Sequence, residues 1–183
     1  MKKIYFALIL AAPLAAQNFE IGVNLSQQSY TSSSTPGVAP VVFDYDSKTV
    51  IAARVGYSVV DLGPALFQIT AAYQPKTETN LKPNGITVPT KLNYEYSGIG
   101  AMFNFKALVA VGAGMDYRFE KSTKENIYTG THSYGRPWAR LNAGYAFPSP
   151  VVKPFIGLEV AAPLATENDG PKLQVGIYGG VRF

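Results

Sequence analysis

The stretch 109–120 reads VAVGAGMDYRFE, and apolar residues alternate in it with glycines and charged residues. Valine, alanine, methionine, tyrosine and phenylalanine occupy the odd positions, and after Ala110 every even position holds glycine, aspartate, arginine or glutamate. Side chains of a β-strand point alternately to its two faces, whereas a helix repeats about every 3.6 residues. The stretch therefore predicts a strand with one apolar face and one face of glycines and charges.

Seven further segments have the same period of two, and we expect each to form a strand. They start near Phe19, Lys48, Phe67, Leu92, Arg136, Val152 and Leu173. The segment 92–105 is less regular, because Tyr94 and Tyr96 indicate one outward face whereas the apolar residues from Ile99 onward indicate the other. We expect a β-bulge near Gly98 to reconcile the two halves.

The connections between the eight segments alternate in length. Long polar stretches lie at about 31–47, 76–90, 121–133 and 163–171, and short ones lie at 61–64, 104–106 and 148–150. This order predicts an up-and-down meander with both chain ends on the short-turn side. The expected fold class is all-β, an eight-stranded antiparallel up-and-down barrel.

The first 17 residues have the composition of a secretory signal peptide. Lys2 and Lys3 precede an apolar run that is too short to span a membrane, and small residues follow it near Gln17. We expect cleavage near Gln17, which leaves residues 18–183 as the barrel domain. No internal stretch approaches the roughly 20 continuous apolar residues of a membrane-spanning helix. The chain has no cysteine, so we expect no disulfide, thiolate metal site or lipidated cysteine.

Aromatic residues on the apolar face gather at both ends of the expected strands. Near the short turns these are Phe19, Tyr57, Phe67, Tyr145, Phe147 and Phe183, and near the long loops they are Tyr73, Tyr117 and Phe119. Two such bands are typical of barrels that meet lipid, where aromatic rings lie at the two membrane interfaces. A soluble barrel of lipocalin type, with the apolar face lining a cavity, is the disfavoured alternative.

The last strand, 173–183, reads LQVGIYGGVRF and resembles the C-terminal signal of bacterial outer-membrane barrels. In that signal a terminal aromatic residue follows alternate apolar positions, and the matching residues here are Val175, Ile177, Tyr178, Val181 and Phe183. With the leader and the strand count, the chain resembles the small eight-stranded group that includes the outer membrane protein A transmembrane domain, outer membrane protein X and the opacity-type adhesins. The resemblance implies a Gram-negative outer-membrane location, contact with membrane lipid and lipopolysaccharide, and recognition by the barrel-assembly machinery.

Charged residues on the second face are expected to lie inside the barrel. They are Glu20, Arg54, Asp116, Arg118, Arg140, Glu159 and Arg182. An isolated buried ion costs several kcal/mol, so charges enclosed in a narrow barrel have to be paired. We therefore expect a network of salt bridges that plugs the interior. A gated ion path is the alternative, but about eight strands leave room only for side chains.

The sequence indicates no catalytic residue, cofactor or metal site, and we expect a structural or surface-interaction role for a monomer with four external loops. One alternative is transport or binding of small hydrophobic molecules in a pocket near Trp138 and Phe155. Another is an outer-leaflet lipid-modifying enzyme that uses His132 and Ser133, although adjacent strand residues point to opposite faces. The net charge of +4 falls to +2 without Lys2 and Lys3, which gives no argument for nucleic acid.

Overall fold

A computed structural model describes residues 19–30, 33–34, 42–83, 91–106, 108–125, 129–165, 167 and 170–183. The expected leader, residues 1–17, lies outside the described residues. The described strands are β1 (Phe19–Tyr30), β2 (Ser33–Ser34), β3 (Val42–Tyr45), β4 (Lys48–Asp61), β5 (Ala65–Pro83), β6 (Lys91–Phe105), β7 (Ala110–Glu125), β8 (Gly130–Ala146), β9 (Lys153–Pro163) and β10 (Pro171–Arg182). No helix that could cross a membrane occurs among these residues.

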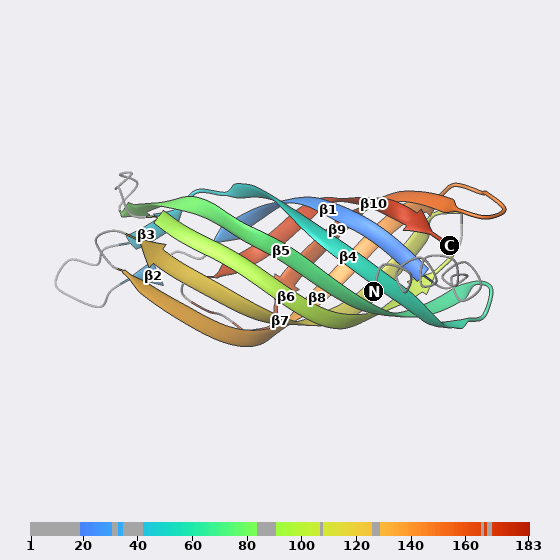
Figure 1. Ribbon diagram of the computed structural model, residues 1–183, viewed down its shortest axis with the longest axis horizontal. Helices are drawn as coiled ribbons and strands as arrows, with labels where there is room; N and C mark the ends of the chain where they lie inside the picture. Colours follow the sequence, from blue (N-terminus) through green and yellow to red (C-terminus); the bar gives the residue numbers. More distant parts are fainter. Residues whose placement is uncertain are drawn as a thin grey trace, which may run out of the picture.

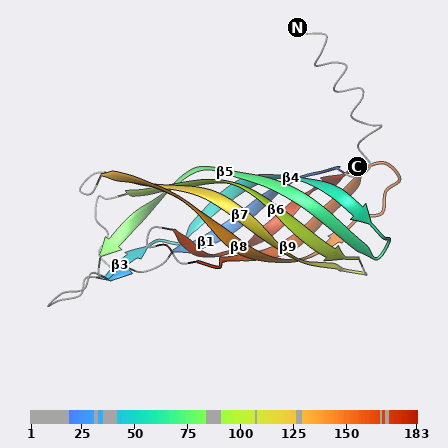
Figure 2. The same ribbon diagram turned by 90° about the horizontal axis from the view of Figure 1, so that it is seen from below.

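Eight of the strands, β1 and β4 to β10, close into one antiparallel barrel (Figures 1 and 2). Each strand pairs with the next one along the chain, and β1 closes the ring by pairing with β10, from Glu20 opposite Arg182 to Tyr30 opposite Pro171. The predicted eight-stranded meander is therefore confirmed. The turns after β4, β6 and β8 are short, and we call their side of the barrel the short-turn end.

The strands at the opposite, long-loop end are longer than the sequence predicted. β5 continues to Pro83, β6 starts at Lys91, β7 continues to Glu125 and β8 starts at Gly130. Much of the expected loops 76–90 and 121–133 is thus paired strand. The short strands β2 and β3 add to the extended part of β5 at this end (Figure 1).

The expected bulge near Gly98 is wrong. β6 pairs with β7 in one uninterrupted register, and its tyrosines Tyr94 and Tyr96 point inward, where both are buried. They pack with Tyr30, Leu92 and Ala52, and with the partly buried Ala72. The register shift between β5 and β6 lies instead in β5, between Gln74 and Thr77. Pro75 lies there, and a proline has no N–H to donate to the hydrogen bonds between strands.

The barrel exterior is an apolar belt. All nine aromatic residues of the two predicted bands are exposed on it, with Phe119 56% exposed at one end and Phe147 49% exposed at the other. Aliphatic residues such as Leu158 and Leu141 cover the surface between the bands. So large an apolar surface is unfavourable in water but favourable in contact with the hydrocarbon of a bilayer. The soluble alternative is therefore wrong, because the apolar face lies outside and the charged face inside.

The turn between β4 and β5 is built around Gly63, whose φ of 79° favours glycine. Its backbone N–H donates to Asp61 Oδ1 at 3.0 Å. Lys106 in the next turn donates to Asp61 Oδ2 at 2.5 Å, and this bond holds the pKa of the Asp61 carboxyl below its usual range. The pair links two adjacent turns at the short-turn end.

Candidate functional site

The centre of the barrel interior contains an ion pair between opposite walls. Arg54 on β4 donates from Nη1 and Nη2 to the two carboxylate oxygens of Glu159 on β9, at 2.7 and 2.6 Å. Asn24 on β1 donates a further bond of 2.7 Å to Glu159. All three side chains are at most 9% exposed. A bidentate arginine–carboxylate pair is a strong, directional contact, so it holds these walls at a fixed separation.

Asp116 on β7 joins two more arginines to this pair. Its Oδ2 lies 3.3 Å from Arg140 Nη1 and 3.6 Å from Arg118 Nη2. Arg140 Nε also lies 3.8 Å from Glu159 Oε2. Arg54, Glu159, Arg140, Asp116 and Arg118 thus form one connected set of charges, which we call the central network.

A separate pair lies near each end of the interior. At the short-turn end Arg182 donates to Glu20 at 2.5 Å. Toward the long-loop end Arg136 donates from Nε and Nη2 to Glu120, at 2.9 and 2.8 Å, and the Trp138 indole N–H also donates to Glu120, at 2.5 Å. The sequence prediction left out Glu120 and Arg136, although both lie on the polar faces of their strands, so the alternation alone would have included them.

Arginine side chains and aromatic rings alternate on the long-loop side of the central network. The Arg118 guanidinium lies 4.4 Å from the centre of the Tyr96 ring and 4.0 Å from that of Trp138. Arg136 lies 4.9 Å from the Trp138 ring and 5.6 Å from the Tyr134 ring. A cation over a desolvated aromatic face gains about 2 kcal/mol, so the rings stabilise the two buried guanidinium groups and pack the lumen. We call it the guanidinium–aromatic stack.

Replacing Arg118 with lysine is expected to lower the free energy of unfolding by about 1–2 kcal/mol, because an ammonium cannot lie flat between two rings. The near-ultraviolet circular dichroism of Trp138, which is the chain's single tryptophan, is expected to change as well. Lys121→Arg, on the same strand but with an exposed side chain, is the matched control and leaves both unchanged. An unaltered Trp138 spectrum in Arg118→Lys would contradict the stack.

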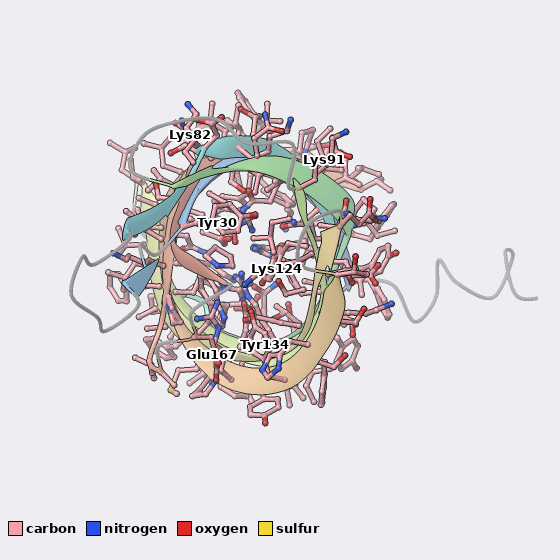
Figure 3. All side chains as sticks on the ribbon, turned by 90° about the vertical axis from the view of Figure 1, so that its left-hand side faces the viewer. Tyr30, Lys82, Lys91, Lys124, Tyr134 and Glu167 are labelled. Carbon is pink, nitrogen blue, oxygen red and sulfur yellow. The ribbon has the colours of Figure 1, made fainter. Side chains whose placement is uncertain are left out.

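The long-loop end of the interior is rich in tyrosine. Tyr30, Tyr94 and Tyr96 pack with Leu92 and Ala52, and Gln28 donates to Gln74 at 2.8 Å beside them. Figure 3 looks into the barrel from this end and shows side chains filling the lumen, with Tyr30 and Lys124 across the mouth. Side chains therefore block the lumen here as well.

A small cavity lies on the short-turn side of the central network. It offers about 10 Å³ to the centre of a water-sized sphere, which is room for about one water molecule. Arg54, Arg140, Asn142 and Arg182 lie in its wall. A cavity of this size does not form a channel.

Trp138 and Phe155, which the alternative of small-molecule binding places in one pocket, lie far apart. On the paired strands β8 and β9, Trp138 lies opposite Pro163 whereas Phe155 lies opposite Ala146, eight residues further along. That separation corresponds to roughly 26 Å along a strand. Trp138 belongs to the guanidinium–aromatic stack, and Phe155 packs against Tyr178 at 5.5 Å between ring centres near the short-turn end.

No protein-family model and no curated protein matches the chain. Among solved structures, the outer membrane protein OprG from Pseudomonas aeruginosa is similar, with a TM-score of 0.55 over 92% of this chain and 94% of that chain at 9% identity. The chain has the fold of a small outer-membrane β-barrel. Ail, the attachment invasion locus protein of Yersinia pestis, aligns at a TM-score of 0.49 and 13% identity over 91% of this chain and 98% of that one. Neisserial surface protein A aligns at a TM-score of 0.48 and 14% identity over 90% of this chain and 95% of that one.

In an outer-membrane barrel the short turns face the periplasm and the longer connections face the exterior. The short-turn end with Arg182 and Glu20 is therefore the periplasmic end, and the extended strands β5 to β8 lie on the extracellular side. The apolar belt is the surface that contacts lipid.

His132 and Ser133 lie in the extracellular part of β8. His132 is 61% exposed, with its Nε2 4.0 Å from Glu167 Oε2, and it stacks beside Tyr134 at 5.0 Å between ring centres. Ser133 is exposed opposite Lys121. The two side chains point to opposite faces of one strand, so the structure does not bring them together as a nucleophile and a base.

The residues of the expected C-terminal signal lie on β10 and just after it. Val175, Ile177 and Phe183 are exposed on the lipid side, with Val181 half-buried. Tyr178 instead points inward, where it packs against Phe155. The backbone N–H of Phe183 donates to the carbonyl of Phe19 at 2.8 Å, which joins the two ends of the barrel chain.

Proposed function

We propose that the protein is a non-enzymatic outer-membrane barrel with a structural or surface-interaction role. The observation that carries the proposal is the packed interior: salt bridges, the guanidinium–aromatic stack and the tyrosine cluster lie along the described lumen, and the cavity among them has room for about one water molecule. A barrel without a continuous aqueous path contributes rigidity and an external surface rather than permeation. That surface consists of the extended strands β5 to β8 with the added strands β2 and β3.

The partners proposed for this role are outer-membrane lipid, lipopolysaccharide and an extracellular partner bound by the loops. We also propose that the chain is a monomer, that residues 1–17 are removed on export, and that the barrel-assembly machinery recognises Val175, Ile177, Tyr178, Val181 and Phe183. The exposed Val175, Ile177 and Phe183 side chains support the last point, because they are accessible from outside the barrel.

Conductance across a planar bilayer tests the plugged interior. The purified barrel is expected to give no stable, reproducible single-channel current, because arginine–carboxylate pairs and aromatic rings occupy the lumen. The variant Trp138→Gly with Arg118→Ser removes the middle of the stack and serves as the comparison. A stable current from the unmodified protein at the level of the variant would contradict the proposal.

Shortening the extracellular strands tests the surface role. Replacing residues 76–90 and 121–133 by tight turns is expected to abolish adhesion of cells that display the barrel, while heat-dependent gel mobility shows that the membrane-embedded part still folds. Shortening the periplasmic connection 148–152 is the matched control and leaves adhesion unchanged. Loss of lipid A modification on His132→Ala would instead support the enzymatic alternative.

A further inference from the structure

The barrel interior contains one more positive than negative charge. Between its two mouths the described residues include the arginines Arg54, Arg118, Arg136, Arg140 and Arg182 and the carboxylates Glu20, Asp116, Glu120 and Glu159. The end pairs Arg182–Glu20 and Arg136–Glu120 balance. The central network is therefore left with three guanidinium groups and two carboxylates.

Arg140 shares both carboxylates of the central network with the other two arginines, since its Nη1 lies 3.3 Å from Asp116 Oδ2 and its Nε lies 3.8 Å from Glu159 Oε2. Arg54 has its bidentate bonds to Glu159, and Arg118 lies between two aromatic faces and donates to Gln174 at 2.8 Å. Arg140 donates only to neutral groups, Met102 Sδ at 3.0 Å and Thr70 Oγ1 at 3.1 Å. Its Nη1 makes no hydrogen bond to any described residue, although the side chain is only 1% exposed.

Arg140 also lines the small cavity on the short-turn side of the central network. Arg140, Arg54 and Arg182 all lie in its wall, and the carboxylate there, Glu20, already accepts bonds from Arg182 and Gln68. Arg54 Nε and Asn142 Oδ1 are also buried without a hydrogen bond to a described residue. Asn142 can turn its amide by half a rotation and present N–H groups to a ligand instead.

We propose that this cavity is a binding site for a single small monovalent anion, of the size of a halide. An arginine does not lose its proton in a protein, so the excess positive charge persists and attracts an ion of opposite sign to the cavity that three arginines line. A neutral water molecule would fill the space and leave the charge uncompensated. The cavity admits one water-sized particle, which excludes organic anions. Arg182 at the periplasmic mouth is 23% exposed, so the ion enters from the periplasm.

Halide-dependent stability of the refolded barrel tests the site. At equal ionic strength, the midpoint of heat-induced unfolding, followed by gel mobility, is expected to be higher by at least about 3 °C in sodium chloride than in sodium gluconate. Crystals grown with sodium bromide are expected to show one anomalous peak within about 3.5 Å of the Arg140 guanidinium. Equal midpoints in the two salts, or bromide only on the surface, would overturn the proposal in favour of water.

Two variants remove the need for the anion in different ways. Asn142→Asp places a fixed carboxylate in the cavity wall, and Arg140→Gln removes the excess charge. Both are expected to unfold at the same temperature in chloride and in gluconate. Asn80→Asp makes the same substitution on the exposed extracellular part of β5 and is expected to keep the chloride dependence. Chloride dependence that persists in the folded Asn142→Asp and Arg140→Gln barrels would show that the anion binds elsewhere.

Discussion

Replacing Glu159 with leucine is expected to lower the free energy of unfolding by about 3–5 kcal/mol, the largest loss among single substitutions in the lumen. The change removes both bonds to Arg54 and the carboxylate that lies 3.8 Å from Arg140 Nε. The three buried guanidinium groups of the central network are then left with Asp116 as their single carboxylate. Urea unfolding of the barrel in lipid vesicles measures the effect. A substitution that broke only a surface ion pair would cost at most about 1 kcal/mol.

Glu125→Leu supplies that surface comparison, because Glu125 pairs with Lys76 at 3.1 Å and both side chains are exposed. Adding Arg54→Met to Glu159→Leu is expected to recover part of the loss, since the pair is then replaced by apolar groups and no new charge is left unpaired. A cost below about 1 kcal/mol for Glu159→Leu would mean that water reaches the central network and screens it.

Replacing Leu158 with arginine is expected to cost about 2–4 kcal/mol, because the side chain lies on the exterior near the middle of the apolar belt. Leu158 is 62% exposed and lies between Ile177 and Ala143 on the neighbouring strands. In water such an exposed leucine would tolerate arginine with little change. The free energy of unfolding in lipid vesicles therefore reports directly whether this face meets hydrocarbon.

Ser97→Arg is the control at a different depth. Ser97 is exposed between Tyr73 and Phe119, at the level of the extracellular aromatic band, where an arginine costs about 0–1 kcal/mol. The two arginine variants thus differ by about 1–4 kcal/mol if the belt lies in the bilayer as described. Equal costs at the two depths would disagree with this placement of the membrane.

The period of two in the sequence determined the fold class and the two faces, because the direction of a side chain on a strand depends only on its place in the alternation. Phe119 and Arg118 point to opposite sides of the wall wherever β7 is placed. Alternation also indicated which charges enter the lumen. It failed at Tyr94 and Tyr96, because their amphipathic side chains suit either a membrane interface or a packed interior.

Only the tertiary structure decided which of the enclosed charges pair. Arg54 and Glu159 are separated by 105 residues and lie on strands that are not neighbours in the sheet, so their contact depends on the closure and width of the barrel. The same holds for Arg118, which lies between rings from β6 and β8. The cavity beside Arg140 follows from these pairings. A local pattern cannot determine them, because strand register and closure are properties of the whole barrel.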